Sequence, residues 1–101
     1  MNYTENYEGI KLDVQAVDIT ITDDLQQAIR DSISKLKRFV SEINWVDVYL
    51  NLEANQSPDN RTIGIRLGIP GTDVYASDSG EHWLPILKSL EDKLRRQLEK
   101  R

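Results

Sequence analysis

The chain has 101 residues and a mass of 11.6 kDa, which is the usual size of one folding unit. Its 39% hydrophobic and 30% charged residues are typical of a globular protein, and no stretch approaches the roughly 20 consecutive apolar residues of a membrane helix. It has no cysteine, which excludes disulfides and thiolate sites, and its formal net charge of -4 argues against phosphate-rich partners. Because the acidic N-terminus lacks the basic and apolar parts of a secretory signal, we expect a cytoplasmic protein with a flexible extension, residues 1–9, and a single domain, residues 10–101.

Apolar and polar residues alternate over residues 10–16, which predicts a half-buried strand. The sequence Thr22-Asp23-Asp24 is typical of a helix start, where a hydroxyl caps free backbone N–H groups and acids favour the helix dipole. Apolar residues then recur at three- and four-residue intervals, as on one face of a helix. The pattern predicts a helix that ends near Ser41.

The period of two returns over residues 45–52 and again over 63–69, which predicts two further strands. Residues 54–60 between them are rich in turn formers, so we expect a flexible loop there. Pro70-Gly71 predicts a tight reversal into a short strand at 74–76 that stops at 78–80. A helical pattern from Trp83 to the chain end completes the order β-α-β-β-β-α.

The predicted fold class is α+β, a two-layer sandwich with a mixed four-stranded sheet. A strand, a helix and a second strand in succession favour a right-handed crossover between parallel strands, whereas the later short turns favour antiparallel neighbours. Each strand has only one apolar face, so we expect both helices to cover the same face of the sheet.

The residues that most resemble a catalytic set surround the single histidine, His82. Asp78, Ser79 and Glu81 crowd with it into one strand-to-helix turn, where Ser and Asp more often cap a helix. The glycines at 64, 68 and 71 do not lie between a strand and a helix, as a phosphate-binding loop requires. We therefore expect no enzyme activity, no metal, no cofactor and no small-molecule substrate.

Basic residues gather in two windows, near the predicted end of the first helix and along the second helix. Up to Asp31, by contrast, seven acidic residues accompany only two basic ones. If both helices run the same way on one face, their positive ends meet at one edge. Cations at helix ends also stabilise the helix dipole by about 0.3–1 kcal/mol each, so solvated helix ends and a polyanion site remain equally favoured. The candidate polyanion-binding residues are Lys35, Lys37, Arg38, Lys88, Lys93, Arg95, Arg96 and Lys100.

Aromatic and cationic side chains are also expected on the outer face of the sheet. These are Trp45, Tyr49, Tyr75, Arg66 and Lys11. They suit stacking on unpaired bases. Cross-strand pairing, which stabilises a sheet without any ligand, is the favoured interpretation.

Several segments in order match one known family. They are Ile21-Thr22-Asp23-Asp24-Leu25, then Lys35-Leu36 with Phe39, then Tyr75-Ala76-Ser77 before Gly80, and finally Asp92-Lys93-Leu94-Arg95-Arg96-Gln97-Leu98-Glu99-Lys100. On these segments the chain resembles the hibernation-promoting factor and ribosome-associated inhibitor family, also called the sigma-54 modulation protein family, in its short form. The likeness covers residues 10–101.

The resemblance implies a translation inhibitor of resting or stressed cells that is a monomer away from the ribosome. It implies contacts with small-subunit ribosomal RNA where messenger and transfer RNA would lie, with Lys35, Lys93, Arg96 and Lys100 at matched positions. The other four candidates are added because they lie near these. The alternative is a non-enzymatic protein-interaction module on the same fold, with weak or no RNA binding, which would use the outer sheet face or the acidic first third.

Overall fold

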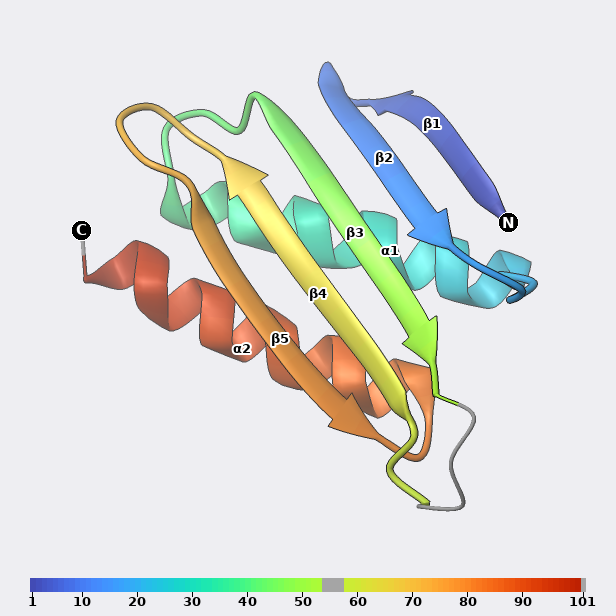
Figure 1. Ribbon diagram of the computed structural model, residues 1–101. Helices are drawn as coiled ribbons and strands as arrows, with labels where there is room; N and C mark the ends of the chain where they lie inside the picture. The colour runs from blue at the N-terminus through green and yellow to red at the C-terminus, as the bar shows by residue number, and fades with distance from the viewer. Residues whose placement is uncertain (54–57, 101) are drawn as a thin grey trace.

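The computed structural model describes residues 1–53 and 58–100 and contains a mixed sheet of five strands with two α-helices (Figure 1). The predicted α+β class is therefore confirmed, whereas the predicted number of strands is wrong. In chain order the elements are β1 (Asn2–Tyr7), β2 (Ile10–Ala16), α1 (Asp23–Leu36), the short 3-10 helix η1 (Lys37–Phe39), β3 (Trp45–Leu52), β4 (Arg61–Gly68), β5 (Val74–Gly80) and α2 (Trp83–Glu99).

The strands lie in the order β1-β2-β3-β4-β5. The connection through α1 makes β2 and β3 parallel, as the sequence predicts, and the other neighbouring pairs are antiparallel. The reversal between β4 and β5 contains Gly71, whose φ of 98° explains why a glycine is needed there. Part of the predicted 54–60 loop, residues 54–57, lies outside the described residues.

The additional strand is β1, which occupies the segment expected to be a flexible extension. It pairs with β2 along its whole length, from Asn2 opposite Gln15 to Tyr7 opposite Ile10. The intervening turn places Glu8 and Gly9 at φ values of 52° and 83°, as a tight hairpin turn requires. The expectation of a flexible segment at residues 1–9 is therefore corrected for the six residues of β1.

The first helix begins at the predicted position but ends earlier than predicted. The Thr22 hydroxyl accepts a hydrogen bond from the Leu25 N–H at 3.3 Å, which confirms the predicted N-cap. Helix α1 ends at Leu36, before the predicted Ser41, and the 3-10 helix η1 continues the chain over Lys37–Phe39.

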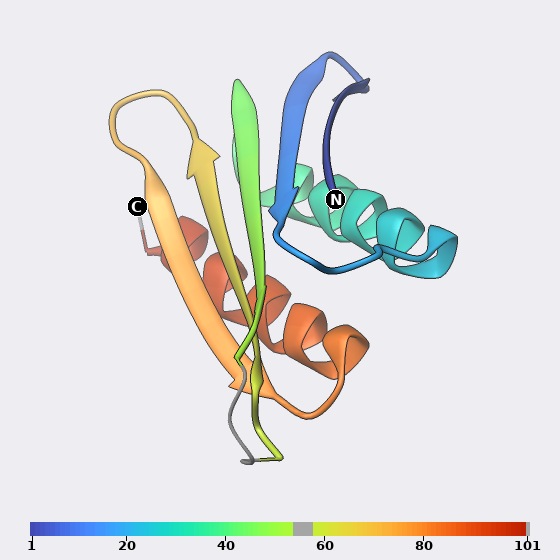
Figure 2. The same ribbon diagram turned by 45° about the vertical axis from the view of Figure 1, so that its right-hand side comes forward.

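Both helices pack behind the same face of the sheet (Figures 1 and 2). Buried apolar side chains of α1 and α2 join those of β2, β3, β4 and β5 in one hydrophobic cluster. Among its members with no exposed surface are Leu12, Val46, Leu67, Leu90 and Leu94. In the described part of the chain, neither helix is long and apolar enough to cross a bilayer.

Candidate nucleic-acid interface

The C-terminal ends of α1 and α2 lie at the same end of the molecule, because both helices run in the same direction (Figure 1). The Arg95 guanidinium of α2 lies 6.0 Å from the centre of the Phe39 ring in η1, so the two ends are in contact. This contact brings the two basic windows near one another, whereas Lys37 pairs with Glu8 in the turn after β1 and Lys93 pairs with Asp78 of β5, the strands at opposite edges of the sheet. We call this surface the basic rim, and it consists of Lys35, Lys37, Arg38, Lys93, Arg95, Arg96 and Lys100.

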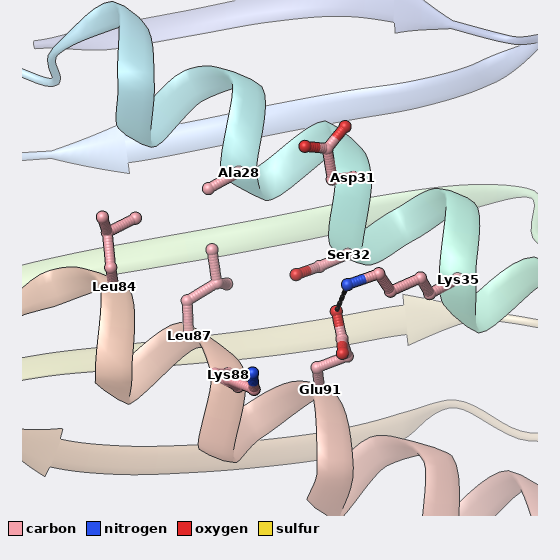
Figure 3. A pocket seen from close by; sticks show the side chains of 8 residues that line it. All are labelled: Ala28, Asp31, Ser32, Lys35, Leu84, Leu87, Lys88 and Glu91. Atoms are coloured by element: carbon pink, nitrogen blue, oxygen red, sulfur yellow. Dashed lines mark ion pairs between the residues drawn. The ribbon is translucent and has the colours of Figure 1, made fainter.

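A shallow groove of about 170 Å³ runs between the helices toward the basic rim (Figure 3). Lys35 of α1 reaches across it to Glu91 of α2, with Nζ 3.9 Å from the carboxylate. The remaining candidate, Lys88, lines the groove one turn earlier on α2, so it lies beside the basic rim. The lining side chains are Ala28, Asp31, Ser32, Lys35, Leu84, Leu87, Lys88 and Glu91.

Most cations of the basic rim are paired with carboxylates of the same chain. Asp92 holds two of them, with its oxygens 2.6 Å from Arg95 and 2.8 Å from Arg96. Arg95 also pairs with Glu99 at 2.5 Å. Two further pairs come from the sheet side of the molecule, Lys37 with Glu8 at 2.9 Å and Lys93 with Asp78 at 3.5 Å.

These ion pairs are exposed to solvent, and their exposure determines the free energy that a ligand must supply to break them. The cationic side chains retain 39% of their surface for Lys37 and Arg95 and 66% for Arg96. Ion pairs in such surroundings are worth about 0–1 kcal/mol, so a phosphate can replace the carboxylate at small cost. Hydrogen bonding from Arg95 keeps the pKa of Asp92 below its usual range, so Asp92 remains anionic at neutral pH.

Three of the predicted residues have no ion pair within residues 1–53 and 58–100. They are Arg38, Lys88 and Lys100. Their charges are available to a polyanion without breaking any ion pair between described residues. The neighbouring Arg101 lies outside the described residues.

The outer face of the sheet presents the predicted aromatic residues, but two of the rings rest on glycines. A Cβ at Gly68 would collide with the Trp45 ring, and one at Gly64 would lie 2.6 Å from the Tyr75 hydroxyl. Arg66 also stacks on the Tyr75 ring, 4.8 Å from its centre. These contacts support a structural role, in which aromatic rings cover the backbone left bare by glycine.

The residues around His82 are engaged in contacts that support the fold. Asp78 accepts a hydrogen bond from Ser89 of α2, which lowers the pKa of its carboxyl, and Ser79 exchanges a 3.0 Å hydrogen bond with Thr62. The expectation that Ser or Asp caps α2 is wrong, because the cap is His82, which makes no side-chain cap bond in the described part of the chain. Within that part, no group of three or more potential ligands is placed to hold a metal.

Sequence reasoning missed the carboxylates that pair with the basic rim. The spacing of Asp92 from Arg95 and Arg96, three and four residues along a helix, was a readable signal for those pairs. Glu8 gave no such signal, because its pairing with Lys37 depends on a strand that was not predicted.

Comparison with known proteins identifies similar sequences and folds. Residues 12–101 match the model of a family described as sigma 54 modulation protein / S30EA ribosomal protein. The ribosome hibernation promoting factor of Escherichia coli K12 is 28% identical over 91 residues, which are 90% of this chain and 92% of that protein.

Two solved structures share the fold. The N-terminal domain of Protein Y from Thermus thermophilus superposes with a TM-score of 0.73 at 18% identity, covering 95% of this chain and 98% of that one. A ribosomal subunit interface protein from Coxiella burnetii gives a TM-score of 0.71 at 17% identity, covering 88% and 93% of the two chains.

Proposed function

Because the chain belongs to the sigma 54 modulation protein and S30EA ribosomal protein family, we propose that it is a hibernation factor that binds the ribosome and inhibits translation in resting cells. We place its contacts on small-subunit ribosomal RNA, in the channel used by messenger and transfer RNA. The protein acts in the cytoplasm, as a monomer when it is off the ribosome, and catalyses no reaction. Its curated relatives carry the name ribosome hibernation promoting factor, which supports a role on the ribosome.

The observation that carries the proposal is the meeting of two basic helix ends at one edge of an acidic molecule. Arg95 of α2 lies over Phe39 of η1, and Lys35 and Lys88 line the groove between α1 and α2. The seven cations of the basic rim outnumber the five carboxylates that pair with them, Glu8, Asp78, Glu91, Asp92 and Glu99, so the local charge stays positive although the net charge of the chain is -4. The rim is therefore the surface best suited to a phosphate backbone.

Binding at the basic rim is an exchange of partners. An RNA phosphate replaces Asp92 at Arg96, or Asp78 at Lys93, while Arg38 and Lys100 add contacts without losing any described ion pair. Phosphate carries charge along a continuous chain, so one RNA segment can satisfy several rim cations at once. The carboxylates hold the cations in place before RNA arrives, and the counterions that RNA releases on binding make the affinity sensitive to salt.

Charge reversal at the end of α2 tests the proposal. We expect Arg96→Glu combined with Lys100→Glu to weaken co-sedimentation with Escherichia coli small ribosomal subunits by at least about a hundredfold, since each charged hydrogen bond is worth about 1.5–3 kcal/mol. Arg96 is 66% exposed and Arg95 still satisfies Asp92, so the fold should survive.

A matched control keeps the same change of total charge but moves it to the outer sheet face. Lys11→Glu combined with Arg66→Glu should leave ribosome binding within about twofold of the unmodified protein, because rim charges act locally. Equal losses in both double variants would contradict a site at the basic rim.

The exposed side chains of the outer sheet face favour a second candidate, a protein-interaction module. Tyr49 and Tyr75 keep 38% and 43% of their surface exposed on the face opposite the helices. A pull-down from nuclease-treated lysate separates the two functions. Loss of the captured partner after RNA digestion supports RNA binding, whereas a partner that persists and is lost on Tyr49→Ala supports the protein-interaction module.

A further inference from the structure

Strand β1 precedes the residues that match the family, which begin at Leu12. Its inward-facing side chains fasten it to α1. Glu5 accepts hydrogen bonds from Nε and Nη2 of Arg30 at 2.8 and 2.9 Å, and the Tyr7 hydroxyl lies 2.6 Å from the Ser34 hydroxyl. The strand therefore follows α1 toward the basic rim.

The hairpin turn at the end of β1 delivers an acidic side chain to the basic rim. Glu8 accepts a hydrogen bond from Nζ of Lys37 at 2.9 Å. This pair links the turn to η1 across 29 positions of the chain, so it exists only because β1 folds back along β2. The ammonium of Lys37 lowers the pKa of Glu8, which keeps the carboxylate charged at neutral pH.

The backbone at Glu8 is unfavourable for this residue type. Its φ of 52° lies in the left-handed region, which glycine and asparagine adopt more readily than glutamate does. The turn by itself favours the pair Asn-Gly, so the local structure does not explain a glutamate before Gly9. The contact with Lys37 does explain it.

We propose that Glu8 competes intramolecularly with RNA for Lys37 and so sets the affinity of the basic rim. The inference rests on the proposed function, because Lys37 is one of the cations assigned to RNA. Both members of the pair are exposed, with 39% and 48% of the side-chain surface free for Lys37 and Glu8, so a phosphate can reach Lys37 and displace the carboxylate. β1 and its turn thus act as an acidic strap that weakens RNA binding.

The substitution Glu8→Asn removes the competitor and suits the turn. We expect the variant to bind Escherichia coli small ribosomal subunits about two- to fivefold more tightly at about 50 mM salt, as loss of one exposed pair allows. The gain should shrink between about 50 and 200 mM salt, where exposed charges are increasingly screened. Thermal unfolding should show a melting temperature at or above that of the unmodified protein.

The chain provides a matched control at Asp18. This exposed acid also has a left-handed φ, 57°, but it lies between β2 and α1, at the end of α1 far from the basic rim. Asp18→Asn raises the net charge by the same amount and eases the same kind of backbone conformation. Its binding should match that of the unmodified protein.

A double-variant cycle tests whether Glu8 changes the affinity through its contact with Lys37. In a Lys37→Gln background, Glu8→Asn should no longer change the affinity, because the group for which Glu8 competes is gone. Tighter binding of Glu8→Asn alone, lost in that background, supports the strap.

Two other outcomes separate the strap from the proposed function. If the unmodified protein binds and Glu8→Asn binds equally, or if the gain persists in the Lys37→Gln background, the strap is wrong while the proposed function stands. If no variant binds ribosomal subunits, the proposed function fails and the strap fails with it.

Discussion

The aromatic residues on the outer sheet face have both a structural and a functional interpretation. Trp45 and Tyr75 have the aromatic rings that a base-stacking surface would need, but each covers a glycine on β4. Because Gly68 opposes Trp45 directly in the ladder, the ring and the missing side chain form one packed unit. The sequence therefore correctly predicted where the rings lie, and it could not reveal that a glycine lies beneath each.

Substitution of Gly68 by alanine tests the packed unit. The new Cβ would overlap the Trp45 ring, so the ring must move, and we expect the free energy of unfolding to fall by about 1–3 kcal/mol. Urea denaturation of Gly68→Ala measures it. In a Trp45→Ala background the same substitution should be nearly neutral, and an equal loss in both backgrounds would show that the ring is not responsible.

At the scale of elements, β1 is the strand that the sequence analysis did not predict. Strands β2 to β5 were visible because aliphatic residues alternate with polar ones, whereas β1 presents Tyr3, Glu5 and Tyr7 to α1. From the sequence alone Glu5 would be expected to face solvent, but the structure pairs it with Arg30. Two signals for a hairpin were available. Tyr3 and Tyr7 lie four positions apart, as residues on one face of a strand do, and Gly9 comes just before a clear strand.

The contact between β1 and α1 predicts an acid-dependent stability. Hydrogen bonds from Arg30 lower the pKa of Glu5 in the folded protein, so the pair stabilises the fold above the ordinary glutamate pKa of about 4.3. That contribution is lost as the pH falls through the lowered pKa, where Glu5 becomes protonated. The difference in free energy of unfolding between the unmodified protein and Glu5→Gln should therefore be largest near pH 7 and shrink as the pH falls below about 4.3.

Urea denaturation at pH 7, 4 and 3 provides the measurement. Tyr7→Phe is the control, because it removes the contact with Ser34 in the same strand without removing a charge, and its effect should change little over this range. A pH-independent effect of Glu5→Gln would contradict a stabilising carboxylate at this position.

At the scale of the whole molecule, the chain is an acidic body with basic residues at one edge, where both helices end. From β2 onward the order of elements was predictable from hydrophobic periodicity, and the shared direction of the helices, expected only if both begin from equivalent strand ends, brings Lys35, Phe39 and Arg95 to that edge. The pairing of the edge with Glu8 and Asp78 was not predictable, because those acids reach it from segments distant in sequence. Under the proposed function, affinity for RNA depends on exposed pairs that open, rather than on net charge.

The dependence of ribosome binding on salt tests this account most directly. If the basic rim neutralises about six phosphates, the affinity for small ribosomal subunits should fall about a thousandfold between 50 and 200 mM salt, measured by co-sedimentation. Failure to sediment with the subunits at 50 mM salt, or an affinity that stays constant over that range, would contradict RNA binding through the basic rim.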